Sequence, residues 1–64
     1  MQEHEQRVVT ERDELLSKLT KLDHFQDTEL FAGLAYEDRK LLNIQRSAMA
    51  TYAECLNARI GRFT

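Results

Sequence analysis

The 64-residue sequence contains no proline, no tryptophan, only two glycines and a single cysteine. A lone cysteine cannot form a disulfide within the chain, and one cysteine with two histidines falls short of the four ligands of a structural zinc site. A chain of this length buries only about 60% of the surface that its unfolded form exposes, so it is marginally stable alone. We therefore expect its stability to come from helix packing and self-association, with no metal and no cofactor.

Neither charge sign is in large excess, because nine basic side chains face eleven acidic ones, for a net charge of −2. This balance lacks the basic stripe that is typical of nucleic-acid binders. No apolar run approaches the roughly 20 residues of a membrane span, and the opening stretch "MQEHEQRVV" is too polar for a secretory signal. We predict no membrane or nucleic-acid partner, and an unpaired cysteine favours a reducing cytoplasm.

Motifs of known enzymes are also missing from the sequence. It has no phosphate-binding P-loop, no glycine-rich nucleotide turn, no nucleophile elbow and no HExxH zinc motif. His4 and His24 are too far apart for a metal pair on one helix, and Cys55 has no basic neighbour in sequence, which predicts a buried, inert thiol. We therefore predict no catalytic residue, no metal ligand and no enzymatic activity.

Residues that favour helices are plentiful, above all Leu, Ala, Glu and Arg. Val8, Leu15 and Leu22 recur every seven residues, and Leu19 lies between them. This spacing is the signature of an amphipathic helix, which we predict over residues 3–26.

The helical period breaks over residues 27–35 and resumes over 36–62. Within the break, Asp27 or Thr28 can cap a short helical turn. Because the connection is short, the two long helices should be antiparallel neighbours. The predicted fold is all-α: one domain over residues 1–64, an antiparallel two-helix hairpin with a helical turn in its connection.

Gln45, Tyr52 and Arg59 form a polar stripe with a spacing of seven on the second helix. One interpretation is that they control the register of the helix seam, since polar seam residues fix which neighbour lies opposite which. The other is a pocket in which the arginine and amide hold a phosphate while the aromatic ring stacks a base. We favour register control. In the simplest register these three side chains lie opposite, in order, Leu22, Leu15 and Val8.

The second helix carries more apolar surface than one hairpin seam can cover. Large exposed apolar patches usually mark an interface. We therefore predict a homo-oligomer, a helical bundle with coiled-coil packing. The predicted oligomer interface consists of Leu42, Ile44, Ala48, Met49, Ala53, Leu56 and Ile60.

Arginines begin the first helix and end the second, so antiparallel packing should gather them at the open end of the hairpin. Salt bridges to neighbouring glutamates are one interpretation. The other is a site for a compact anion such as a cyclic nucleotide, formed where several chains meet. The candidate ligand-binding residues are Arg7, Arg12, Tyr52, Arg59, Arg62 and Phe63.

The segments "HEQRVVTERDELLSKLTKL" and "LL..Q...M..Y...L..RI", together with Phe25, Phe31 and Leu34 between them, resemble a set of small phage and prophage proteins. These proteins are related to a crAss-like phage small protein, and the resemblance extends from His4 to Phe63. It implies a phage-encoded accessory protein that acts in the cytoplasm of a bacterial host.

Phage helical hairpins that oligomerise and sequester nucleotide immune signals, the anti-CBASS and anti-Thoeris sponges, offer an analogy of fold. By this analogy we predict a counter-defence factor that binds a cyclic nucleotide or an ADP-ribose-type signal. One alternative is an inhibitor that binds a host defence protein directly through an exposed helix face. Another is an accessory of the virion or its assembly.

Overall fold

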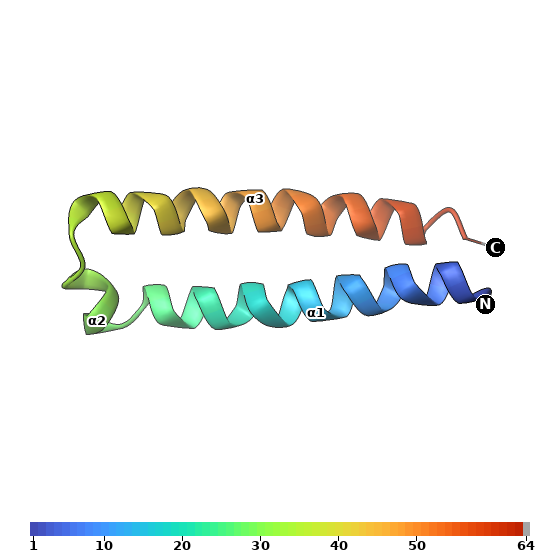
Figure 1. The fold of residues 1–64 in the computed structure, drawn as a ribbon, viewed down its shortest axis with the longest axis horizontal. Coiled ribbons are helices and arrows are strands. Elements are labelled where there is room, and N and C mark those ends of the chain that lie inside the picture. The colour runs from blue at the N-terminus through green and yellow to red at the C-terminus, as the bar shows by residue number, and fades with distance from the viewer. Residues whose placement is uncertain (64) are drawn as a thin grey trace.

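A computed structural model of the protein describes residues 1–63, and Figure 1 shows its fold as a helical hairpin 46 × 15 × 13 Å in extent. The two long helices, α1 (Glu3–Gln26) and α3 (Tyr36–Ile60), run antiparallel and pack against each other. The short helix α2 (Glu29–Ala32) lies at one end and both termini lie at the other. This confirms an all-helical hairpin. No helix in this part of the chain has both the length and the apolar character that crossing a membrane requires.

Local interactions stabilise the beginning of α1. The backbone N–H of Gln2 donates to the Glu5 carboxylate at 3.0 Å, which closes a capping box around the first turn. Glu3 and Glu5 place negative charge at the positive end of the helix dipole. Arg7 then forms an ion pair with Glu3 one turn back, at 2.8 Å.

The hairpin closes through α2, whose N-cap is Thr28 rather than Asp27. The Thr28 hydroxyl accepts a hydrogen bond from the Phe31 N–H at 3.2 Å and donates to the Phe25 carbonyl at 2.6 Å. The rings of Phe25 and Phe31 pack edge to face with centroids 6.0 Å apart. Phe31 and Leu34 are half-buried, so α2 folds back over the closed end and covers it.

The helix α3 begins without a side-chain cap, because Ala35 occupies the N-cap position. Glu37 and Asp38 in its first turn favour the helix through the dipole. It ends at Ile60, two residues before the predicted end, where the Gly61 N–H donates to the Asn57 carbonyl at 3.0 Å. Gly61 therefore acts as the C-cap.

The register of the hairpin differs from the simplest one. In the predicted register Asp23 lies opposite Ile44, whereas the structure bonds Asp23 to Arg46, two residues further along α3. Two more side-chain hydrogen bonds between α1 and α3 agree with this register. They join Arg12 to Asn57 at 3.0 Å and Gln26 to Asn43 at 2.8 Å.

The buried core lies on a different face of α3 from the predicted one. Leu56 is completely buried, Ala53 is buried, and Val8 of α1 is buried with them. The prediction that Gln45, Tyr52 and Arg59 lie in the seam is wrong, since all three are exposed. Burying the large apolar side chains gains about 25 cal/mol per Å², while leaving the polar stripe in water avoids its desolvation cost.

Because α3 packs on α1 through a different face than predicted, the predicted oligomer interface changes as well. Most of that set packs against α1 within the chain, so it is not free for a second copy. Ile44 and Ala48 alone of the set are exposed in the single chain. The members that belong to the hairpin core are Leu42, Met49, Ala53, Leu56 and Ile60, which are buried or half-buried.

Candidate ligand-binding edge

The exposed polar stripe of α3 runs along one edge of the hairpin. At about 100° per residue, Gln45, Tyr52 and Arg59 fall beside the buried face, on the side away from Asn43 and Asn57. Antiparallel packing brings like edges of two helices together, so α1 contributes Glu11 and Lys18 to this side. We name these five exposed residues the Tyr52 edge.

Arg12 lies on the opposite edge, and two of its five N–H donors are already bonded within the chain. Its Nη1 donates to Asn57 Oδ1 at 3.0 Å, and its Nε donates to Asp13 Oδ1 at 2.9 Å. The side chain is only 27% exposed. The structure therefore does not bring Arg12 together with Arg59, and the four arginines do not form one cluster.

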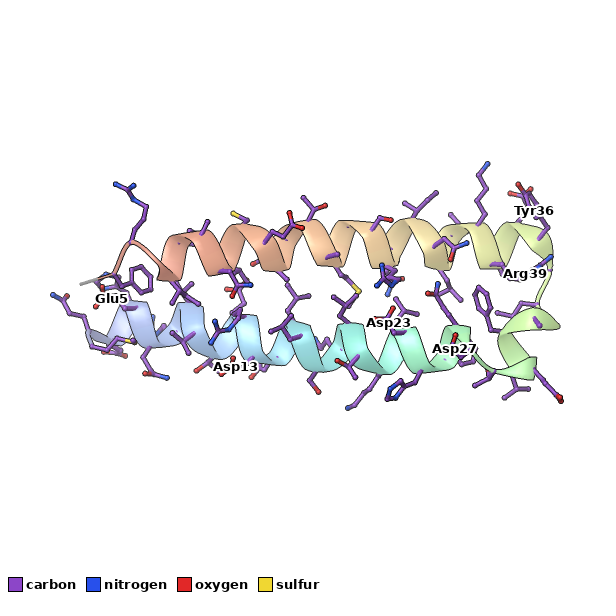
Figure 2. The ribbon with its side chains drawn as sticks, turned by 180° about the vertical axis from the view of Figure 1, so that it is seen from behind. Glu5, Asp13, Asp23, Asp27, Tyr36 and Arg39 are labelled. Carbon is purple, nitrogen blue, oxygen red and sulfur yellow. The ribbon has the colours of Figure 1, made fainter. Side chains whose placement is uncertain are left out.

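Asp23 and Arg46 form the strongest polar contact between α1 and α3, and it is also on the edge of Arg12. Figure 2 shows Asp23 pointing from α1 toward α3, where both carboxylate oxygens accept from the Arg46 guanidinium. The hydrogen bond from Arg46 lowers the pKa of Asp23 below its ordinary value of 3.8. The same bond raises the pKa of Arg46. This pair, rather than the Tyr52 stripe, links α1 to α3 in the observed register.

The remaining arginines differ in their partners. Arg7 is highly exposed and bonded to Glu3. No carboxylate of residues 1–63, Glu11 included, lies within 4.0 Å of Arg59 or Arg62. Arg59 is thus an exposed cation on the Tyr52 edge without an acidic partner among the described residues.

Tyr52 presents an aromatic surface on the same edge, with 45% of the residue exposed. Lys18 faces this edge from α1, and no carboxylate of the described residues lies within 4.0 Å of it. The sequence reasoning missed Lys18, although its spacing of seven from Glu11 and from Phe25 could have indicated it. An exposed ring on an edge that also carries two cations is suited to stack a base and to hold its phosphates.

Phe63 lies at the open end and is half-buried, so only part of its ring is accessible. Within residues 1–63 the single chain has no pocket and no group of three potential metal ligands. Cys55 is exposed, which corrects the prediction of a buried thiol. The Tyr52 edge is therefore an open surface of the single chain.

A second exposed surface lies on the face of α3 directly opposite the hairpin core. Leu41 and Ile44 are 62% and 55% exposed there, and smaller side chains continue the line toward the end of the helix. We name this surface the outer stripe. It consists of Leu41, Ile44, Ala48, Thr51, Cys55 and Ala58, all of them exposed.

Comparison with known proteins places the whole hairpin within one family. The Sequestin family model matches residues 2–62, which include both long helices, the Tyr52 edge and the outer stripe. A protein of Enterobacteria phage T4, described as an uncharacterized 7.5 kDa protein in the denB-rIIB intergenic region, is 35% identical over 60 residues. The alignment covers 94% of each chain. No solved structure matches this chain.

Proposed function

The chain belongs to the Sequestin family of small phage proteins, and on that premise we propose that it captures a small signalling molecule of the bacterial host and withholds it from the receptor. The family name denotes sequestration and not catalysis. A binding protein of this kind acts by mass action in the host cytoplasm. Relatedness to a crAss-like phage protein stays a prediction.

The proposed ligand is a nucleotide signal, either a cyclic nucleotide or an ADP-ribose derivative. The observation that carries this proposal is the exposed ring of Tyr52 on the same edge as Lys18 and Arg59, neither of which has a carboxylate of residues 1–63 within 4.0 Å. Stacking of a base on an aromatic ring is worth about 1–3 kcal/mol. An arginine adds bidentate hydrogen bonds to phosphate oxygens. Together these groups supply both halves of nucleotide recognition.

We propose further that the protein acts as a homo-oligomer, in which ligand sites form where chains meet. Support comes from the apolar outer stripe, which a single hairpin leaves in water. An open edge covers only one side of a nucleotide, whereas small-molecule sites generally bury most of the ligand. A second chain beside the Tyr52 edge would cover another side of the nucleotide.

Isothermal titration calorimetry of the full chain against a panel of cyclic nucleotides and ADP-ribose derivatives tests the proposal. We expect one ligand class to bind, and Tyr52→Ala and Arg59→Gln each to weaken its affinity by about tenfold, equivalent to roughly 1.4 kcal/mol.

The control is Tyr36→Ala, which removes a tyrosine that is also exposed, at the closed end of α3 and away from the Tyr52 edge (Figure 2). It should bind like the wild type. Failure of every panel member to bind would contradict a nucleotide signal.

A second candidate function is direct inhibition of a host defence protein, and the outer stripe favours it. An exposed amphipathic helix face can dock into an apolar groove of a partner. Affinity capture from host lysate should then return one stoichiometric partner, and Ile44→Glu should abolish the capture while Ser17→Glu on the outer face of α1 should not. Presence of the protein in purified particles would instead favour a virion or assembly role.

A further inference from the structure

The outer stripe has the side-chain pattern of a helix–helix contact. Its members follow one another at spacings of three and four residues, as in a heptad seam. The Thr51 hydroxyl donates to the Ser47 carbonyl at 3.0 Å within the helix, so its hydrogen bond is already made. The stripe is therefore suited to be covered by another apolar surface.

Charged side chains of opposite sign lie at the two ends of the outer stripe. Glu37 precedes Leu41 by four residues in the first turn of α3, where Arg39 and Lys40 also follow Asp38, and Arg62 comes four residues after Ala58. A parallel α3 of a second copy would set Glu37 against Glu37 and Arg62 against Arg62. An antiparallel copy sets Glu37 against Arg62 twice, and it also opposes the two helix dipoles.

The sizes of the side chains along the outer stripe also favour an antiparallel second copy. Leu41 and Ile44, in the first half of the stripe, are large, whereas Cys55 and Ala58, in the second half, are small. Antiparallel pairing about a point between Ala48 and Thr51 sets each large side chain against a small one. Such alternation lets two helix surfaces interdigitate without voids or clashes.

From these two independent complementarities we propose that the occupant of the outer stripe is the α3 helix of a second copy of this chain, packed antiparallel about a two-fold axis. The proposal rests on the self-association part of the proposed function. In its layers Leu41 faces Ala58 of the second copy, Ile44 faces Cys55, Ala48 faces Thr51, and Glu37 faces Arg62.

This pairing has a consequence for the candidate site. Because like edges of antiparallel helices meet, the Tyr52 edges of both copies lie on the same side of the dimer. Tyr52 of one copy then neighbours Gln45 of the other. The ligand-binding surface becomes one continuous strip with contributions from two chains. Arg62 is then part of the dimer interface and not of the ligand-binding surface.

The solution mass of the full chain, measured by sedimentation velocity and light scattering without nucleotide, tests the pairing. We expect an oligomer for the wild type and a mass reduced by half or more for Ala48→Glu, because the variant buries two unpaired carboxylates at the two-fold axis. Ser17→Glu, which adds the same charge on the outer face of α1, should keep the wild-type mass. A wild-type monomer up to millimolar concentration overturns the proposal, and a host protein as the occupant would give that result.

Cross-linking tests the orientation of the two helices. Ile44→Cys should form an intermolecular disulfide between position 44 and the native Cys55 of the second copy on mild oxidation, since side chains that face each other across a close helix contact can bring their Cα atoms within the roughly 7 Å that a disulfide spans. Ser17→Cys should not link to Cys55. A wild-type Cys55–Cys55 link would show parallel packing and overturn the proposal.

These results separate the pairing from the nucleotide proposal. An oligomer without the 44–55 link refutes the pairing and leaves nucleotide binding to calorimetry. A linked dimer that binds no nucleotide refutes the ligand and leaves the interface intact.

Discussion

The inner and outer faces of α3 are both apolar along the length of the helix, yet they have opposite environments. The inner face packs on α1 and contains the buried Ala53 and the completely buried Leu56. The outer face leaves Leu41 and Ile44 more than half exposed. A two-helix hairpin can cover only one face of each helix, and the second apolar face supports the proposal that the hairpin is part of a larger assembly.

The contrast also separates stability from recognition. Side chains of the inner face hold the hairpin together. The ion pair of Asp23 and Arg46 links the two helices on the edge opposite the Tyr52 edge. The Tyr52 edge and the outer stripe add little to the single chain. Substitutions on these surfaces should therefore affect binding without unfolding the hairpin.

The largest expected effect comes from removing the inner face's central side chain. Leu56→Ala should lower the free energy of unfolding by about 2–5 kcal/mol, because it leaves a cavity where no water enters. Leu41→Ala on the outer face should change it by no more than about 0.5 kcal/mol in dilute, monomeric protein. Urea unfolding followed by circular dichroism measures both. Equal losses would show that the two faces are not distinct.

A smaller effect should follow from enlarging an alanine on each face. Ala53→Leu adds volume to a filled core and should destabilise the hairpin by about 1–3 kcal/mol. Ala48→Leu adds the same atoms on the outer face, where the single chain has room for them. Thermal unfolding of the two variants at one low concentration gives the comparison. A midpoint for Ala53→Leu that matches the wild type would contradict the assigned core.

The smallest effect on stability should come from the ion pair of Asp23 and Arg46, and it should depend on pH. Arg46 lowers the pKa of Asp23, so the native state binds this proton less readily than the unfolded state does. The stabilisation is therefore complete above the ordinary pKa of 3.8 and is lost as the pH falls through the lower pKa of the folded protein. Asp23→Asn should be slightly less stable than the wild type near neutral pH and should converge with it in acid.

Acid titration of thermal stability for the two proteins measures this difference. Asp13→Asn, also on α1, is a control for the general loss of one carboxylate. A constant difference between Asp23→Asn and the wild type at every pH would contradict a stabilising ion pair between Asp23 and Arg46.

Local sequence signals were enough to predict the hairpin. The heptad of Val8, Leu15 and Leu22 indicated α1, and Thr28 was one of two residues expected to cap α2. Caps and helical periodicity depend on neighbours within a few residues, so the sequence contains all the information they need.

The candidate site could be predicted only in part. Tyr52 and Arg59 were recognised as a polar stripe, but their position was wrong because the stripe was assigned to the seam. Lys18 was missed because it comes from the other helix, and its proximity to the Tyr52 edge exists only after α1 and α3 have packed. Likewise, Arg12 could not be separated from the other arginines before its bond to Asn57 was known.

By itself the sequence determined that this protein is a pair of long amphipathic helices joined by a short connection. Tertiary structure decided which stripe of α3 faces α1. Several lines of side chains on α3 share the spacing of seven. Lines that start one residue apart differ by a rotation of about 100° about the helix axis. Only the packing of Leu56 on α1, with Asp23 bonded to Arg46 beside it, distinguishes them. That choice depends on burial and pairing between residues far apart in the chain, which no local pattern contains.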